Sequence, residues 1–102
     1  MALEIITKKR FENRVKTVLS YLLENWYDSV ADDFMIALKE KIKLLSVQPF
    51  TGELVGSHKN VRTCLVTKHN RIYYRVEKNK LIIINMIDTR RNPKKNPFNK
   101  FK

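Results

Sequence analysis

The sequence predicts an α+β fold: an N-terminal strand, a helical hairpin and then a three-stranded antiparallel meander. Three observations predict it. Apolar residues first alternate along the chain, then recur at helical spacing in two successive segments, then alternate again in three short runs. With 102 residues and 43% hydrophobic content, the chain is large enough for one core but not for two. We therefore expect a single domain over residues 1–102, with helices covering one face of the sheet.

The first two elements are distinguished by the period of their apolar residues. Residues 2–7 alternate and indicate a strand. From Phe11 onward the spacing changes to that of a helix with one apolar stripe, which is wide enough to be buried. The members of this stripe are Phe11, Val15, Val18, Leu19, Leu22, Leu23 and Trp26.

A second helix follows the break at Asp28 and Ser29. Ser29 is a candidate N-cap, and Asp32 stands three residues later, where an acid favours a helix start. Pro49 and Gly52 end the helix. Its expected buried side chains are Ala31, Phe34, Met35, Leu38, Ile42 and Leu45.

The second half of the chain predicts a loop and three strands. Residues 50–59 contain both glycines and form the loop, and the strands are expected at residues 61–67, 71–77 and 81–87. The two connections between these strands are short enough for antiparallel hairpins. Residues 81–84 are apolar at every position, so the last strand is expected to be central and covered on both sides.

The charge is distributed very unevenly between the two parts of the chain. Residues 1–59 carry nine basic and eight acidic side chains, whereas residues 60–102 carry twelve basic and two acidic ones, out of a net charge of +11. Residues 89–102 contain two Asn-Pro pairs and are expected to form an extended basic tail. A basic sheet with a basic tail favours a polyanionic partner such as RNA or DNA. The alternative is a charge excess that serves only solubility.

Strand alternation indicates which basic side chains project together. Arg71, Tyr73 and Arg75 share one face of their strand, and Arg62 joins them if the strand register aligns the faces. Guanidinium groups bind phosphates in a bidentate manner, and a phenol ring stacks on an unpaired base. The alternative is that the tyrosines are ordinary strand aromatics beside solvated arginines. Further candidate nucleic-acid contacts are Lys68, Arg90, Lys94 and Lys95.

Several classes of function are disfavoured by composition. Cys64 is the only cysteine, which excludes an internal disulfide and a cysteine-based metal site. The sequence contains neither an apolar run of membrane-spanning length nor a secretory signal, so we expect a cytoplasmic protein without membrane contact. We expect no cofactor and no metal, and any RNA cleavage would have to use Arg and Lys to stabilise phosphate charge. The acidic residues of the expected helices and first strand are predicted to lie on outward-facing surfaces rather than in a metal cluster: Glu4, Glu12, Glu24, Asp28, Asp32, Asp33 and Glu40.

The chain resembles the RelE/ParE superfamily of small bacterial toxins from type II toxin–antitoxin systems, also known as plasmid stabilisation proteins. The resemblance covers almost the whole chain and is most specific over residues 61–65 and 70–76. A basic residue on one strand, an Arg-hydrophobe-x-Tyr core on the next, and an aliphatic strand followed by Arg-Arg recur in that order in these proteins. The resemblance implies the same fold and a toxin that arrests growth.

The mRNA-cleaving members of the superfamily act on the ribosome and bind the scissile phosphate with basic strand residues. By position, the resemblance assigns that catalytic role to Arg62, to Arg71 and to Arg90 or Arg91. Of the last two, we assign the catalytic role to Arg91. Asp88 stands at the strand end where many relatives carry His, and it is a candidate base or a partner of the following arginines.

Two departures from the mRNA-cleaving pattern favour the other branch. Cys64 stands where those nucleases place a second lysine, and Phe98 and Phe101 stand near the place of a terminal tyrosine. The ParE-like members share the fold without the catalytic residues and are inhibitors of DNA gyrase. Three hypotheses about the function therefore stand side by side: an mRNA-cleaving enzyme, a gyrase inhibitor, and a non-toxic basic nucleic-acid-binding module.

The toxin readings imply a protein partner in addition to the ribosome and mRNA or to DNA gyrase. That partner is a cognate acidic antitoxin, which would neutralise the positive charge and block the site. It is expected as a helix or strand in the groove beside the helical hairpin, or as an added strand at a sheet edge.

Overall fold

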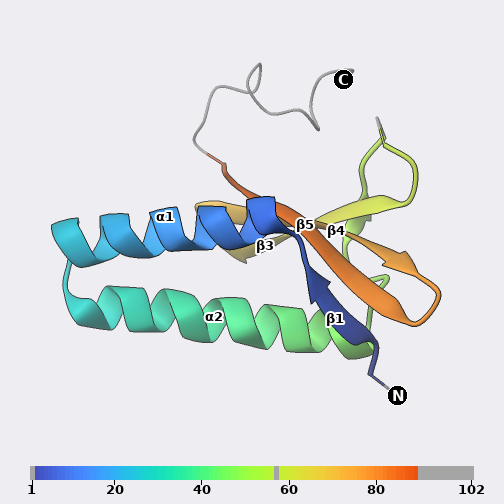
Figure 1. Cartoon of the computed structure of the whole chain (residues 1–102), viewed down its shortest axis with the longest axis horizontal. Coiled ribbons are helices and arrows are strands. Elements are labelled where there is room, and N and C mark those ends of the chain that lie inside the picture. The colour runs from blue at the N-terminus through green and yellow to red at the C-terminus, as the bar shows by residue number, and fades with distance from the viewer. Residues whose placement is uncertain (1, 57, 90–102) are drawn as a thin grey trace.

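A computed structural model describes residues 2–56 and 58–89 and confirms the predicted α+β architecture (Figure 1). The predicted helices and long strands all form, within a few residues of the expected limits. A two-residue strand, β2, lies inside the segment that was expected to be a loop. The elements in chain order are β1 (Glu4–Thr7), α1 (Lys9–Asn25), α2 (Asp28–Val47), β2 (Glu53–Leu54), β3 (Val61–Thr67), β4 (Asn70–Glu77) and β5 (Lys80–Asp88).

The strands form one mixed sheet in the order β1-β5-β4-β3-β2. The neighbouring pairs β2–β3, β3–β4 and β4–β5 are antiparallel, whereas β1 runs parallel to β5. Parallel neighbours require a long crossover, and the helical hairpin is part of the chain that joins β1 to the remaining strands. β5 therefore lies between β1 and β4, which confirms the central position predicted for the last strand.

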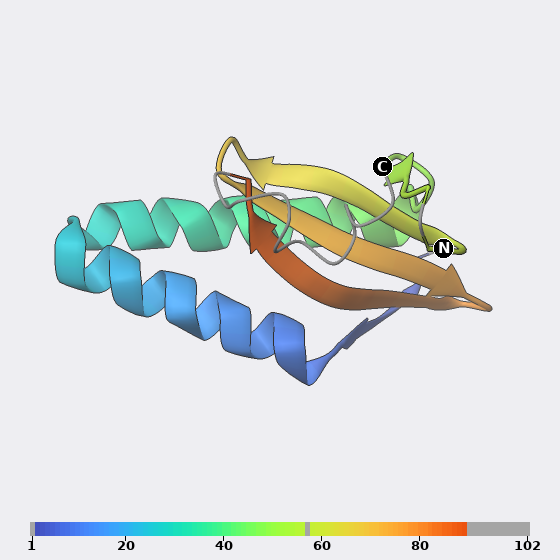
Figure 2. The ribbon, with the colours of Figure 1, turned by 90° about the horizontal axis from the view of Figure 1, so that it is seen from above.

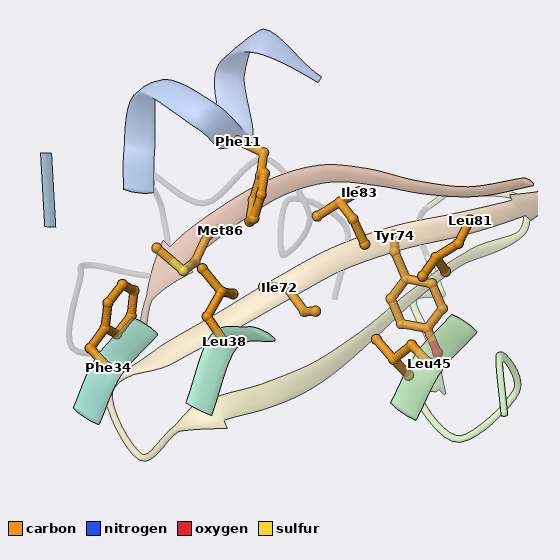
Figure 3. Close-up of a cluster of buried hydrophobic side chains, with 9 residues drawn as sticks. All are labelled: Phe11, Phe34, Leu38, Leu45, Ile72, Tyr74, Leu81, Ile83 and Met86. Atoms are coloured by element: carbon orange, nitrogen blue, oxygen red, sulfur yellow. The ribbon is translucent and has the colours of Figure 1, made fainter. Parts of the chain in front are cut away.

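The hydrophobic core lies between the two helices and one face of the sheet, as the sequence predicts (Figures 2 and 3). Of the α2 side chains that the sequence predicts to be buried, Ala31, Phe34, Leu38 and Leu45 are buried, whereas Met35 and Ile42 are half-buried and pack against the core. Tyr74 at the centre of the sheet is fully buried. Burial of apolar area on this scale is the main stabilising term of a small domain. The core residues are Phe11, Phe34, Leu38, Leu45, Ile72, Tyr74, Leu81, Ile83 and Met86.

An irregularity in β5 explains how an uninterrupted apolar run serves both faces of the sheet. Tyr73 pairs with Asn85 and Tyr74 pairs with Ile83, so Ile84 is an extra residue between the two pairs. A bulge of this kind breaks the strict two-residue period. As a result Ile83 enters the helix-side core, while Ile84 packs against a smaller cluster on the other face.

Two local predictions about the helical hairpin are wrong. Leu23 and Trp26, the last members of the expected buried stripe, are 54% and 57% exposed. The reason is visible in Figures 1 and 2, where the closed end of the hairpin extends beyond the end of the sheet. Ser29 is not the N-cap: α2 begins at Asp28, its N-cap is Tyr27, and no side chain caps it.

Tyr74 fixes the loop after α2 to the sheet. Its hydroxyl donates to the carbonyl of Pro49 at 2.7 Å and accepts from the amide of Gly52 at 3.0 Å. A Cβ at Gly52 would lie 2.5 Å from that hydroxyl and 2.8 Å from the carbonyl oxygen of Thr63. Only glycine fits this close approach, which brings the chain to the edge of β3 where β2 pairs.

Candidate functional site

The outer face of the sheet, opposite the helices, carries part of the predicted site. Arg71, Tyr73 and Arg75 project there, because their neighbours Ile72 and Tyr74 belong to the helix-side core. The pairing of β3 with β4 determines whether Arg62 is added to this group.

That register places Arg62 on the other face. Arg62 pairs with Tyr74 and therefore projects toward the helix side, at the edge of the core. Its Nη1 donates to the carbonyl of Gly52 at 2.8 Å, and its guanidinium lies 5.0 Å from the centroid of the Phe50 ring. These contacts hold the loop before β3. The condition on which Arg62 would join Arg71 and Arg75 is not met.

Tyr73 and Arg75 are engaged within the molecule. The Tyr73 ring is only 3% exposed and packs in a cluster with Val55, Val61 and Ile87. A ring in this position offers little surface for a base to stack on. Arg75 forms an ion pair with Glu77, with 2.8 Å between Nε and Oε1. That pair reduces the positive charge which Arg75 presents.

Arg71 is the predicted strand arginine that lies on the outer face and has no acidic partner among the described residues. It is half-buried, and its Nη1 donates to Thr63 Oγ1 across a long 3.4 Å contact. The Thr63 hydroxyl in turn donates to the carbonyl of Ile72 at 2.9 Å. Arg71 is thus oriented by a neighbouring strand while its guanidinium retains further donors for an anion.

The other predicted site residues lie at one end of the sheet or outside the described chain. Lys68 is exposed in the turn between β3 and β4, and its carbonyl accepts from the hydroxyl of Thr89. Asp88 is the last residue of β5 and pairs in register with Asn70. Four candidates lie outside the described residues, namely Arg90, Arg91, Lys94 and Lys95.

A cleft of about 680 Å³ separates the hairpin from this end of the sheet. One wall is mostly apolar and comes from the helices, while the opposite side is formed by the β3–β4 turn and the end of β5. Among the described residues, Asp88 is the predicted site residue that lines it. We name this feature the hairpin cleft, and its lining residues are Arg14, Thr17, Val18, Tyr21, Leu22, Trp26, Val30, His69, Asn70 and Asp88.

Sequence reasoning expected a groove beside the helical hairpin but did not identify the residues that line the hairpin cleft, because its walls come from distant segments. Tyr21 is 52% exposed and Trp26 is 57% exposed, so the aromatic positions near the cleft are accessible. A long helical pattern with aromatics near the hairpin turn was the available signal, but the length of the sheet was needed to see that they overhang it. An apolar wall facing polar turn residues suits a peptide segment with one apolar side.

Other chemistry is not apparent in the described part of the chain. Residues 2–56 and 58–89 contain no group of three His, Cys, Asp or Glu side chains that could hold a metal ion. Burial raises the pKa of the Cys64 thiol, although the charges of Lys41 and Arg71 act in the opposite direction. A thiol with a raised pKa is a poor nucleophile at neutral pH. No helix in the described ranges is long and apolar enough to cross a membrane.

Solved structures with the same fold include several from toxin–antitoxin systems. A chain of the chromosomal ParDE TA system from P. aeruginosa has a TM-score of 0.72 at 12% identity, covering 85% of this chain and 96% of that one. A chain of the E. coli DinJ-YafQ toxin–antitoxin complex has a TM-score of 0.62 at 17% identity, covering 86% and 93%. The conserved hypothetical protein HP0894 from Helicobacter pylori has a TM-score of 0.56 at 26% identity, covering 85% and 94%. The curated protein sequences gave no match.

The sequence itself identifies the family. Residues 5–93 match the model of the ParE toxin of the type II toxin–antitoxin system parDE. The chain therefore belongs to the ParE toxin family within the RelE/ParE superfamily. Membership confirms the resemblance drawn from the strand pattern, because the family is one of toxins from type II toxin–antitoxin systems.

Proposed function

We propose that this protein arrests growth by binding and inhibiting DNA gyrase rather than by cleaving mRNA on the ribosome. The observation that carries the proposal is the separation of the predicted phosphate-binding arginines. Arg62 lies on the helix side and Arg75 is paired with Glu77, which leaves Arg71 as the one of the three that lies on the outer face with no acidic partner among the described residues.

Cleavage without a metal requires several positive groups placed around one phosphate. Within the described strands, one outer-face arginine without an acidic partner does not supply such a group. The match to the ParE family model supports the same choice, because the ParE-like branch resembles gyrase inhibitors rather than nucleases. A non-enzymatic inhibitor needs a surface for a protein and no proton-transfer residues.

We further propose that the antitoxin places an apolar segment in the hairpin cleft. The apolar helix wall would take the apolar side of that segment, and Arg14 and His69 would face its acidic side chains. Tyr21→Lys should weaken neutralisation by a coexpressed antitoxin, because it puts a charge on the apolar wall. Ile36→Lys is the matched control, since Ile36 is similarly exposed at 54% and does not line the cleft. Equal neutralisation of both variants would contradict this placement.

The decisive experiment compares two activities of the same purified and expressed protein. In a supercoiling assay with purified gyrase we expect inhibition, and after brief induction we expect no new mRNA 5′ ends. The Arg71→Ala variant should still arrest growth. If Arg71 binds the scissile phosphate, that variant should instead be harmless. Arg10→Ala, at an exposed position, controls for the loss of one positive charge. If new mRNA 5′ ends appear and the purified gyrase keeps its full activity, the protein is an mRNA-cleaving enzyme instead. Absence of any growth arrest would establish the non-toxic module.

A further inference from the structure

The closed end of the helical hairpin reaches beyond the end of the sheet, and part of its surface lines the hairpin cleft. Figures 1 and 2 show the end of α1 and the start of α2 extending past the strands in both views. We name residues 20–33 the hairpin tip. Its outer side chains take no part in the core that joins the helices to the sheet. They are therefore available for a purpose other than folding.

The hairpin tip exposes more large apolar surface than folding requires. Four of the ten exposed large hydrophobic side chains in the described residues belong to these 14 positions: Tyr21, Leu23, Trp26 and Tyr27. Tyr27 is 81% exposed and occupies the N-cap of α2, where a small polar residue would serve the helix better. Exposed aromatic and leucine side chains grouped in this way mark a protein-docking surface.

The charge of the hairpin tip is opposite to that of the rest of the chain. It contains four acidic side chains and no Lys or Arg, within a protein whose net charge is +11. All four acids are exposed: Glu24, Asp28, Asp32 and Asp33. A net charge of −4 repels nucleic acid, and it attracts a basic protein surface.

We propose that the hairpin tip docks onto a site of the target protein that combines an apolar depression with surrounding Lys or Arg side chains. This inference rests on the proposed function, because it assumes a protein target rather than mRNA. The aromatic and leucine side chains would fill the depression, and the acids would pair with its basic rim. A second copy of the chain is a poorer occupant, since two molecules of charge +11 repel each other.

Two double variants test the apolar and charged parts of the hairpin tip separately. Leu23→Gln with Tyr27→Ser removes apolar surface, and the serine at the N-cap position favours the helix, so folding should not suffer. Asp32→Lys with Asp33→Lys reverses the charge beyond the first turn of α2. None of these four positions lines the hairpin cleft.

Control positions are exposed residues of α2 beyond the hairpin tip. Val47→Gln removes an exposed apolar side chain (55% exposed), and Glu40→Lys reverses an exposed charge. Circular dichroism and melting curves of all variants would establish that each is folded.

Purified gyrase is the probe. Each double variant is expected to raise the concentration needed for half-maximal inhibition of supercoiling by about tenfold or more, since docking depends on a few central residues. The two controls should inhibit like the wild type. Added salt should weaken the wild type more than the charge-reversed variant, because salt screens the ion pairs that the acids would form.

The possible failures are distinguishable. If the wild type does not inhibit gyrase, the proposed function fails, and this proposal fails with it. If the wild type inhibits and both folded double variants inhibit equally well, the function stands and the hairpin tip is not the docking surface. A concentration-dependent dimer in sedimentation runs of the wild type, abolished by Leu23→Gln with Tyr27→Ser, would show that the surface binds a second copy and would also overturn the proposal.

Discussion

The two faces of the sheet use the same residue types for different purposes. On the helix side, Tyr74 is buried and its hydroxyl links Pro49 and Gly52, while Arg62 is held by the same loop. On the outer face, Tyr73 packs in a small separate cluster and Arg71 keeps donors to spare. The comparison teaches that residue type and alternation along one strand do not identify a site, because the register between strands assigns each arginine to structure or to surface.

The largest expected difference between the faces comes from two adjacent isoleucines. Ile83 is fully buried on the helix side, whereas Ile84 is half-buried on the outer face at the bulge. Ile83→Ala should lower the free energy of unfolding by about 2–5 kcal/mol, because it leaves a cavity in a packed core. Ile84→Ala should lower the free energy of unfolding by clearly less. Urea denaturation of both variants measures the difference, and equal losses would mean that the outer cluster is as important to folding as the core.

The two glycines give the next comparison. Gly52→Ala should lower the free energy of unfolding by about 1–3 kcal/mol, because the new Cβ would press on the Tyr74 hydroxyl and the Thr63 carbonyl. Gly56→Ala is the control: it has no atom within 4 Å of the added Cβ and no positive φ. Thermal melts should show a drop for the first variant and little change for the second. A tolerated alanine at Gly52 would show that the loop can move away from Tyr74.

The fold was largely predictable from the sequence, but the site was not. The helical stripes and strand alternation report burial directly, so the order of the elements and the residues of α2 in the core were correct. The faces of β3 and β4 depend on which residues pair, and the sequence contains no local signal that places Arg62 opposite Tyr74. Leu23 and Trp26 appeared buried because a helical period continues whether or not a sheet lies beneath it. The hairpin cleft joins α1 to a turn more than forty residues later, which periodicity cannot reveal.

Tyr74→Phe tests the hydrogen bonds of the same loop. Loss of the hydroxyl leaves the Gly52 amide and the Pro49 carbonyl without this partner, at a cost of about 1–3 kcal/mol. Burial raises the pKa of Tyr74 above its ordinary value of 10.0, although the hydrogen bond from Gly52 acts in the opposite direction. The folded protein therefore holds this proton more tightly than the unfolded chain. The stability that this raised pKa contributes is fully present below pH 10, and it is lost as the pH rises through the higher pKa of the folded state.

The alkaline loss of stability should accordingly be smaller in Tyr74→Phe than in the wild type. Tyr21→Phe is the control, because its hydroxyl lies on a ring that is 52% exposed. Urea denaturation between pH 8 and pH 11 measures the slope of stability against pH for all three proteins. Identical slopes would mean that Tyr74 titrates alike in the folded and unfolded states.

The smallest expected effect concerns the ion pair on the outer face. Arg75 and Glu77 are 37% and 56% exposed, so Glu77→Gln should change the free energy of unfolding by less than about 1 kcal/mol, and less still in high salt. The same substitution should increase retention on a polyanion column such as heparin, because it frees Arg75 beside Arg71. Lys78→Gln, at an exposed neighbour, should reduce retention instead. A wild-type elution profile for Glu77→Gln would mean that the outer face does not contact polyanions, and that the rest of the basic surface is responsible for retention.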